Sequence, residues 1–179
     1  MSRSVLINIH LYLAAVLAPI VLMLAFSGGL YLLGVKGSVE ETDVQIPADT
    51  QLDFNSTTLQ SDVQTLLGNA GVSHDFEYIK NRGTALFTRP TSREHYQITS
   101  TEGGLTLTRL TPDLQAGLIE LHKGHGPLAF KTLQKFTAAG LIIVLLSGVW
   151  LGLSSPRLRK PTLISSGVGL ALFVVLGFL

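Results

Sequence analysis

The stretch SVLINIHLYLAAVLAPIVLMLAFSGGLYLLGV, residues 4–35, runs for 32 residues without Asp, Glu, Lys or Arg. His10 is the only histidine in it. A helix needs about 20 apolar residues to cross the hydrocarbon core of a bilayer. Because the apolar part is longer than the roughly 7–15 residues of a signal-peptide core, we expect an uncleaved membrane anchor rather than a signal peptide.

Two further runs lack charged side chains, 21 residues at 136–156 and 19 residues at 161–179. Both are long enough to span a membrane, and a buried core helix is the alternative for each. Only 14% of the chain is charged, against about 25% in an ordinary soluble domain. There is no cysteine, which excludes disulfides, thiolate zinc sites, iron–sulfur clusters and thioether-linked haem. We therefore predict an α-helical membrane protein with three transmembrane helices and a small α+β domain outside the cytoplasm.

The predicted domain organisation follows from these runs and from the polar segment between them. It comprises transmembrane helices at 4–35, 128–153 and 161–179, a linker at 36–54, an α+β domain at 55–110, an interfacial helix and turn at 111–127, and a basic loop at 154–160.

The distribution of charge predicts the orientation. All 12 acidic residues lie between Glu40 and Glu120, whereas the loop SSPRLRKP carries three basic residues and no acid. Short loops rich in Lys and Arg face the cytoplasm. We expect the N-terminus and the loop at 154–160 in the cytoplasm, with residues 36–127 and the C-terminus on the opposite side of the membrane. The net charge of +1 gives no indication of nucleic-acid binding.

The segment at 55–110 predicts one helix followed by short strands. Leu59, Val63, Leu66 and Leu67 share one helical face, with Asn55 or Ser56 as the N-cap. After that helix the pattern changes to period two, in the runs HDFEYIK, TALFT, EHYQITS and LTLTRL, which Gly, Pro, Ser and Asn clusters separate. Such runs are typical of an antiparallel meander, on one face of which the helix would pack.

The segment TPDLQAGLIELHKGHGP predicts a second short helix, at the outer membrane surface. Thr111 is the expected N-cap, Pro112 the first helical residue, and Leu114, Leu118 and Leu121 the apolar face. No nucleophile motif, phosphate-binding loop or metal-ligand signature occurs in the predicted domain. We interpret its histidines, His74 and His95, as surface residues, and the sequence favours a protein that is not an enzyme.

The stretch NIHLYLAAVLAPIVLMLAFSGGLYL opens with a histidine and closes with Ser-Gly and an aromatic residue. The stretch LHKGHGPLAFKTLQKFTAAGLIIVLLSGVWLGL does the same and is followed by PRLRKP. The order of helix and then strands between them is similar to a PepSY domain. In these features the chain resembles the PepSY-associated transmembrane proteins of bacteria. The resemblance implies the inner membrane of a bacterium, with residues 36–127 and the C-terminus in the periplasm.

The resemblance implies candidate haem ligands. In larger members of the family, helix histidines bind b-type haem, and some members reduce ferric siderophores. The matching positions are His10 and His122, with His125 matching less directly. The chain departs from that pattern because it has three predicted spans rather than four or more, and its third span has no histidine. A complete haem site is therefore not implied.

Geometry limits what the three histidines could bind together. Spanning helices would separate His10 from His122 and His125 by roughly 30 Å, so one haem could not join them. On one helix, His122 and His125 would share a face, but neighbours on one helix cannot reach opposite faces of a porphyrin. With Glu120 as the one further ligand nearby, a metal ion, a haem and a structural turn all stay open for this pair, and we expect no dedicated metal site.

Two functional hypotheses result. The first is a non-enzymatic inner-membrane accessory protein, which presents the PepSY-like domain to another membrane protein or to a second copy of itself. The alternative is a b-haem subunit that moves electrons across the bilayer toward ferric iron, as a dimer or with a partner.

Overall fold

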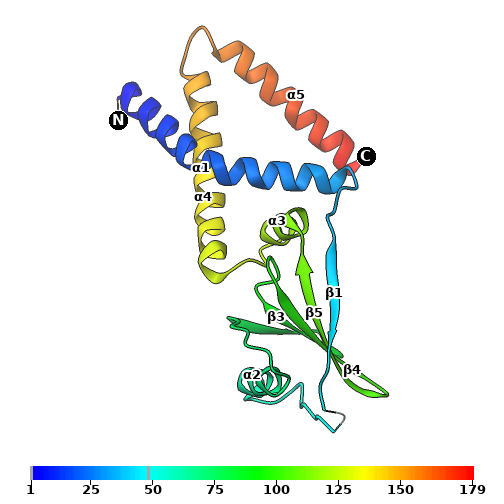
Figure 1. Cartoon of the computed structure of the whole chain (residues 1–179). Coiled ribbons are helices and arrows are strands. Elements are labelled where there is room, and N and C mark those ends of the chain that lie inside the picture. The colour runs from blue at the N-terminus through cyan, green and yellow to red at the C-terminus, as the bar shows by residue number, and fades with distance from the viewer. Residues whose placement is uncertain (1, 48) are drawn as a thin grey trace. The chain divides into compact units, whose positions relative to one another are not determined.

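The structure is a computed structural model that describes residues 2–47 and 49–179. Within the described residues the chain forms five helices and five strands, which alternate as α1, β1, α2, β2 to β5 and then α3 to α5 (Figure 1). They divide into two compact units. One unit combines the described residues up to Val21 with Lys135–Leu179, and the other is Leu22–Gln134.

Three of the helices in the described part of the chain are long and apolar enough to cross a membrane: α1 (Arg3–Leu32), α4 (Leu128–Leu153) and α5 (Arg159–Phe178). Their bounds lie within three residues of the predicted ones. Most of their large apolar side chains are exposed, as in Val16, Phe136 and Leu176. The prediction of three helices with the length and composition of membrane spans is confirmed.

The predicted antiparallel meander is also confirmed. It consists of β2 (Tyr78–Asn81), β3 (Ala85–Arg89), β4 (His95–Thr101) and β5 (Gly104–Pro112). The sheet in the described residues has five strands in the order β1-β5-β4-β3-β2, and each neighbouring pair is antiparallel.

The fifth strand corrects the prediction of a linker at 36–54. Residues Val39–Val44 form β1, an edge strand that pairs with β5 from Val39↔Pro112 to Val44↔Leu107 (Figure 1). The sequence VEETDV lacks an apolar alternation because five of its six residues are exposed at the sheet edge. Edge strands commonly carry charged side chains, which disfavour pairing with other chains.

Helix α2 (Leu59–Asn69) covers one face of the sheet, as predicted. Its residues Val63, Leu66 and Leu67 are buried against apolar side chains of the sheet and the preceding loop, among them Leu86 and Ile98. The expected N-cap is wrong, because the cap position is Thr58. The Ser56 and Thr58 hydroxyls both donate hydrogen bonds to the carboxylate of Asp62 in the first turn.

Helix α3 (Leu114–His122) begins later than predicted. Thr111 and Pro112 are paired with β1 at the end of β5, so neither can cap or start the helix. Asp113 is the N-cap, and its carboxylate accepts a hydrogen bond of 2.8 Å from the Ala116 backbone N–H.

The expected apolar face of α3 is wrong as well. The buried residues of the helix are Ala116, Gly117 and Ile119, whereas Leu114 is 80% exposed. Gly117 fits because a Cβ atom there would lie 2.8 Å from the Ser92 carbonyl oxygen. The small residues bring α3 close to the loop between β3 and β4, which places its polar side chains beside the sheet.

Candidate functional site

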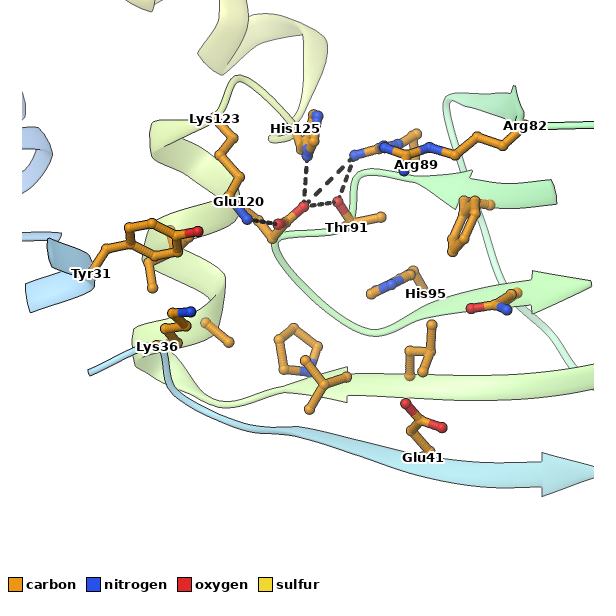
Figure 2. A pocket seen from close by; sticks show the side chains of 17 residues that line it. Tyr31, Lys36, Glu41, Arg82, Arg89, Thr91, His95, Glu120, Lys123 and His125 are labelled. Atoms are coloured by element: carbon orange, nitrogen blue, oxygen red, sulfur yellow. Dashed lines mark hydrogen bonds and ion pairs between the residues drawn. The ribbon is translucent and has the colours of Figure 1, made fainter. Parts of the chain in front are cut away.

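The sheet face that α2 leaves uncovered forms a cavity of about 510 Å³ (Figure 2). Side chains alternate between the two faces of a strand. Because Leu86, Tyr96 and Ile98 point toward α2, their neighbours Phe87 and Gln97 point the other way and line the cavity. Helix α3 contributes one wall of the cavity. The volume is within the roughly 300–1,000 Å³ that is usual for ligand pockets.

The lining is rich in charged side chains. Its basic residues are Lys36, Arg82, Arg89 and Lys123, and its acidic residues are Glu41 and Glu120. With neutral histidines, these four cations and two anions leave a formal excess of two positive charges. Apolar side chains, including Phe87, Leu110 and Ile119, line the remainder. The cavity therefore combines cationic groups with an apolar surface.

Glu120 is the centre of a hydrogen-bond network that joins α3 to the sheet (Figure 2). Its Oε2 atom accepts from the Thr91 hydroxyl at 2.6 Å and contacts His125 Nδ1 at 2.7 Å. Its Oε1 atom lies 3.2 Å from Lys123 Nζ. Partial burial by itself favours the neutral acid, but the hydrogen bonds from Thr91, His125 and Lys123 outweigh it and lower the pKa of Glu120 to about 2.

Arg89, at the end of β3, is the most buried charged side chain of the cavity lining, with an exposed fraction of 4%. Its Nη1 atom donates to the Thr91 hydroxyl at 2.6 Å and lies 3.8 Å from Glu120 Oε2. Within the described residues, its buried Nε–H has no hydrogen-bond partner. Burial lowers the pKa of Arg89, since a low-dielectric environment disfavours the charged form.

His95 corrects a prediction, because it is not a surface residue. It is 6% exposed and lines the cavity from β4. Burial lowers the pKa of His95, although the hydrogen bond with the Arg93 carbonyl opposes that shift. The 2.8 Å contact between Nδ1 and that carbonyl requires a proton on Nδ1. In the neutral ring, Nε2 is then an acceptor.

His74 is not a fully exposed residue either. Its ring lies 4.8 Å from the ring of Tyr96 and 6.3 Å from that of Phe76, on the face of the sheet that α2 covers. Burial lowers the pKa of His74, which favours the neutral ring. This histidine therefore packs at the edge of the apolar core rather than in the cavity.

His122, the last residue of α3, contacts the end of α1. Its Nδ1 lies 2.8 Å from the Leu24 carbonyl oxygen and 3.2 Å from Ser27 Oγ. A Cβ atom at Gly28 would be 2.8 Å from His122 Cε1, so glycine is needed for this close approach. The carbonyl contact places the proton on Nδ1 and leaves Nε2 unprotonated in the neutral ring.

His10 repeats the same arrangement in the other unit. Its Nδ1 lies 2.8 Å from Ser147 Oγ, and a Cβ atom at Gly148 would lie 3.2 Å from His10 Cε1. The Ser147 hydroxyl donates to the Val144 carbonyl at 3.0 Å. The hydroxyl oxygen therefore accepts from His10, which again is protonated on Nδ1. The Ser-Gly pairs of α1 and α4 thus each receive the histidine of another helix.

The structure separates His122 from His125. His125 lies beyond the end of α3, after Gly124 at φ 75°, and its ring contacts Glu120 instead of α1. The side chains of His122 and His125 therefore do not converge on one point. No group of three His, Cys, Asp or Glu side chains in residues 2–47 and 49–179 could hold a metal ion.

Comparisons of the chain with protein-family models, with curated proteins and with solved structures find no match. The structure therefore carries the functional interpretation. Sequence reasoning missed the cavity residues Arg89 and Thr91. It interpreted His95 as a surface residue and named Glu120 only as a possible ligand beside His122 and His125. Alternate residues of a strand face opposite sides of the sheet, so the pattern that predicts the buried core also predicts a second face. This alternation was the one signal in the sequence that could have placed Arg89 and His95 on that face.

Proposed function

We propose that the protein is an integral accessory protein of a bacterial inner membrane, which presents a PepSY-like domain in the periplasm to another membrane protein or to a second copy of the chain. The observation that carries this proposal is the combination of three helices, long and apolar enough to cross a membrane, with an α+β domain that has a core of its own. Helices that are apolar on every side are typical of lipid surroundings. No residue of α5 is buried among the described residues, so its surface is available to lipid or to a partner.

The orientation follows from the basic loop after α4. Arg157, Arg159 and Lys160 lie within the eight residues that follow Leu153, and short loops with such residues stay in the cytoplasm. Residues 36–127 then lie in the periplasm, together with the C-terminus.

Labelling of introduced cysteines tests this topology, because the chain has no cysteine of its own. Thr57→Cys lies on an exposed position before α2, and Ser154→Cys lies on an exposed position just after α4. A membrane-impermeant maleimide applied to intact spheroplasts is expected to label Thr57→Cys fully and Ser154→Cys only after permeabilisation. The reverse pattern, or labelling of neither or both in intact spheroplasts, contradicts the proposal.

A second candidate function is a b-haem subunit for electron transfer, and the histidine tautomers favour it. Metal-ligating histidines generally donate their second ring N–H to a protein acceptor, and both His10 and His122 donate from Nδ1. Their Nε2 atoms have the lone pair that iron requires. The hollow beside His122 holds only about 230 Å³, less than usual ligand pockets. A haem there would need the opposing ligand and further walls from a second chain.

A reduced-minus-oxidised absorption spectrum of the protein, purified from haem-replete cells, distinguishes the two functions. For the accessory function we expect no Soret or α-band difference, either in detergent or in native membranes. A stoichiometric signal that disappears in His10→Ala or His122→Ala, but remains in the control His74→Ala, would replace the accessory function with the haem function.

A further inference from the structure

We propose that the cavity between α3 and the uncovered face of the sheet binds a phosphate monoester attached to an apolar body. This inference goes beyond the accessory function and is independent of it, because every lining residue belongs to the single unit Leu22–Gln134. Two kinds of molecule carry a phosphate monoester on an apolar body: a lipid such as phosphatidic acid, and a soluble organic phosphate.

Arg89 is the anchor of the proposed site. An arginine that is 96% buried normally has all its donors satisfied, whereas Nε of Arg89 is buried without a partner in the described residues. The contacts of this guanidinium with Thr91 and Glu120 involve only its Nη1 atom. A guanidinium binds phosphate through pairs of parallel N–H donors. Nε is closed to solvent as it stands, so a phosphate oxygen that displaced the side chain covering it would supply the acceptor that Nε lacks.

The other charges of the cavity suit a dianion. Glu120 is already compensated by Thr91, His125 and Lys123, so it does not leave an exposed negative charge beside Arg89. Among the described residues, Lys36 and Arg82 form no ion pair with a carboxylate. The excess of two positive charges matches a phosphate monoester, which carries about −1.5 to −2 at pH 7. A carboxylate would neutralise only half of it.

Aromatic rings hold the two unpaired cations near the cavity. Lys36 Nζ lies 5.3 Å from the centre of the Tyr31 ring, and the guanidinium of Arg82 lies 5.7 Å from that of Phe87. Such cation–π contacts restrict the side chains without neutralising their charge. Figure 2 shows Tyr31 and Lys36 on one side of the cavity and Arg82 on the other, with Arg89 and Glu120 between α3 and the sheet.

The apolar part of the lining accounts for the rest of the ligand. Tyr31 and Val39, which are 41% and 44% exposed, and the half-buried Phe87 offer a surface that a free inorganic phosphate would leave in contact with water. An apolar body attached to the phosphate would cover it and add hydrophobic free energy. This is why we infer an amphipathic phosphate rather than a simple anion.

Isothermal titration calorimetry on the full chain in an uncharged detergent tests the proposal, with two probes: phenyl phosphate and dioctanoyl phosphatidic acid. We expect saturable binding of at least one probe, with a dissociation constant raised about tenfold in Arg82→Gln and in Lys36→Gln. Binding of phosphatidic acid alone identifies the lipid source, and binding of phenyl phosphate identifies a soluble one. Benzyl alcohol, which lacks the phosphate, should not bind.

The matched control is Arg109→Gln. Arg109 pairs with Tyr96 in the sheet and therefore lies on the face that α2 covers, outside the cavity. The Arg109→Gln substitution removes one positive charge, as Arg82→Gln and Lys36→Gln do, and should change the dissociation constant by less than twofold. Arg89→Gln tests the anchor itself. If this variant of a buried residue does not fold, the Gln variants of the exposed Lys36 and Arg82 still test the proposal. Absence of binding by both probes, or an equal effect of Arg109→Gln, overturns the proposal.

Discussion

Replacement of Leu67 by Ala is expected to lower the free energy of unfolding of the α+β domain by about 2–5 kcal/mol. Leu67 has no exposed surface and lies in the core between α2 and the sheet. The loss combines the transfer free energy of the removed methyl groups with the cavity that remains. A domain of this size is stable by only about 5–15 kcal/mol, so the loss is a large fraction of its stability. It is the largest effect that we predict for one side chain.

Hydrogen exchange of the full chain in detergent, followed by mass spectrometry, measures this effect. Peptides that cover β3 and β4 should exchange through an opening whose free energy falls by the stated amount in Leu67→Ala. Leu114→Ala is the matched control, since Leu114 is 80% exposed and surface changes usually stay within about 0.5 kcal/mol. Equal exchange in the two variants would contradict the placement of the core.

Replacement of Glu120 by Gln is expected to destabilise the same domain by about 1–3 kcal/mol above pH 4.5, because hydrogen bonds to a charged carboxylate are lost. The wild-type pKa of Glu120 is about 2, below the ordinary value of 4.5. A lowered folded-state pKa stabilises the protein above the unfolded-state value, and this contribution is lost as the pH falls toward the folded-state value. The difference between wild type and Glu120→Gln should therefore diminish between pH 4.5 and about 2.

Chemical denaturation at a series of pH values, monitored by circular dichroism, provides the measurement. Glu102→Gln is the control, because Glu102 is exposed in the turn between β4 and β5 and forms no ion pair among the described residues. It should follow the wild-type curve throughout. A difference between wild type and Glu120→Gln that stays constant down to pH 2 would exclude ionised Glu120 as the source of the stabilisation.

The sequence predicted those parts of the fold in which local pattern and burial coincide. The apolar runs appear as α1, α4 and α5, and the spacing of Val63, Leu66 and Leu67 predicted the buried face of α2. The strand β1 was missed because its edge position removes the need for apolar alternation. The start of α3 was misplaced because Thr-Pro is compatible with both a helix start and the end of a strand, and only the pairing with Val39 and Glu40 decides between them.

The candidate site was less predictable, since it depends on contacts between distant residues. Arg89 and Glu120 are separated by 30 intervening residues in the chain, and neither belongs to a recognised motif. For the histidines, the sequence indicated two similar stretches, one with His10 and one with His122. Each stretch opens with its histidine and closes with a Ser-Gly pair. The sequence did not indicate that each histidine would lie against a Ser-Gly pair of a different helix.

The pairing of β1 with β5 has a mechanical consequence. Ser38 and Asp113 are joined by hydrogen bonds of 2.8 and 2.9 Å at the end of this ladder, just where the chain arrives from α1 and departs into α3. A force that separates these two helices would load the β1–β5 ladder at one end and break its hydrogen bonds one after another. A sheet loaded along its strands must instead break several bonds together. Once the contacts of His122 with α1 are broken, the domain is therefore compliant toward a separation of α1 from α3. The Ser38–Asp113 contact is then the first bond of the ladder that such a force would meet.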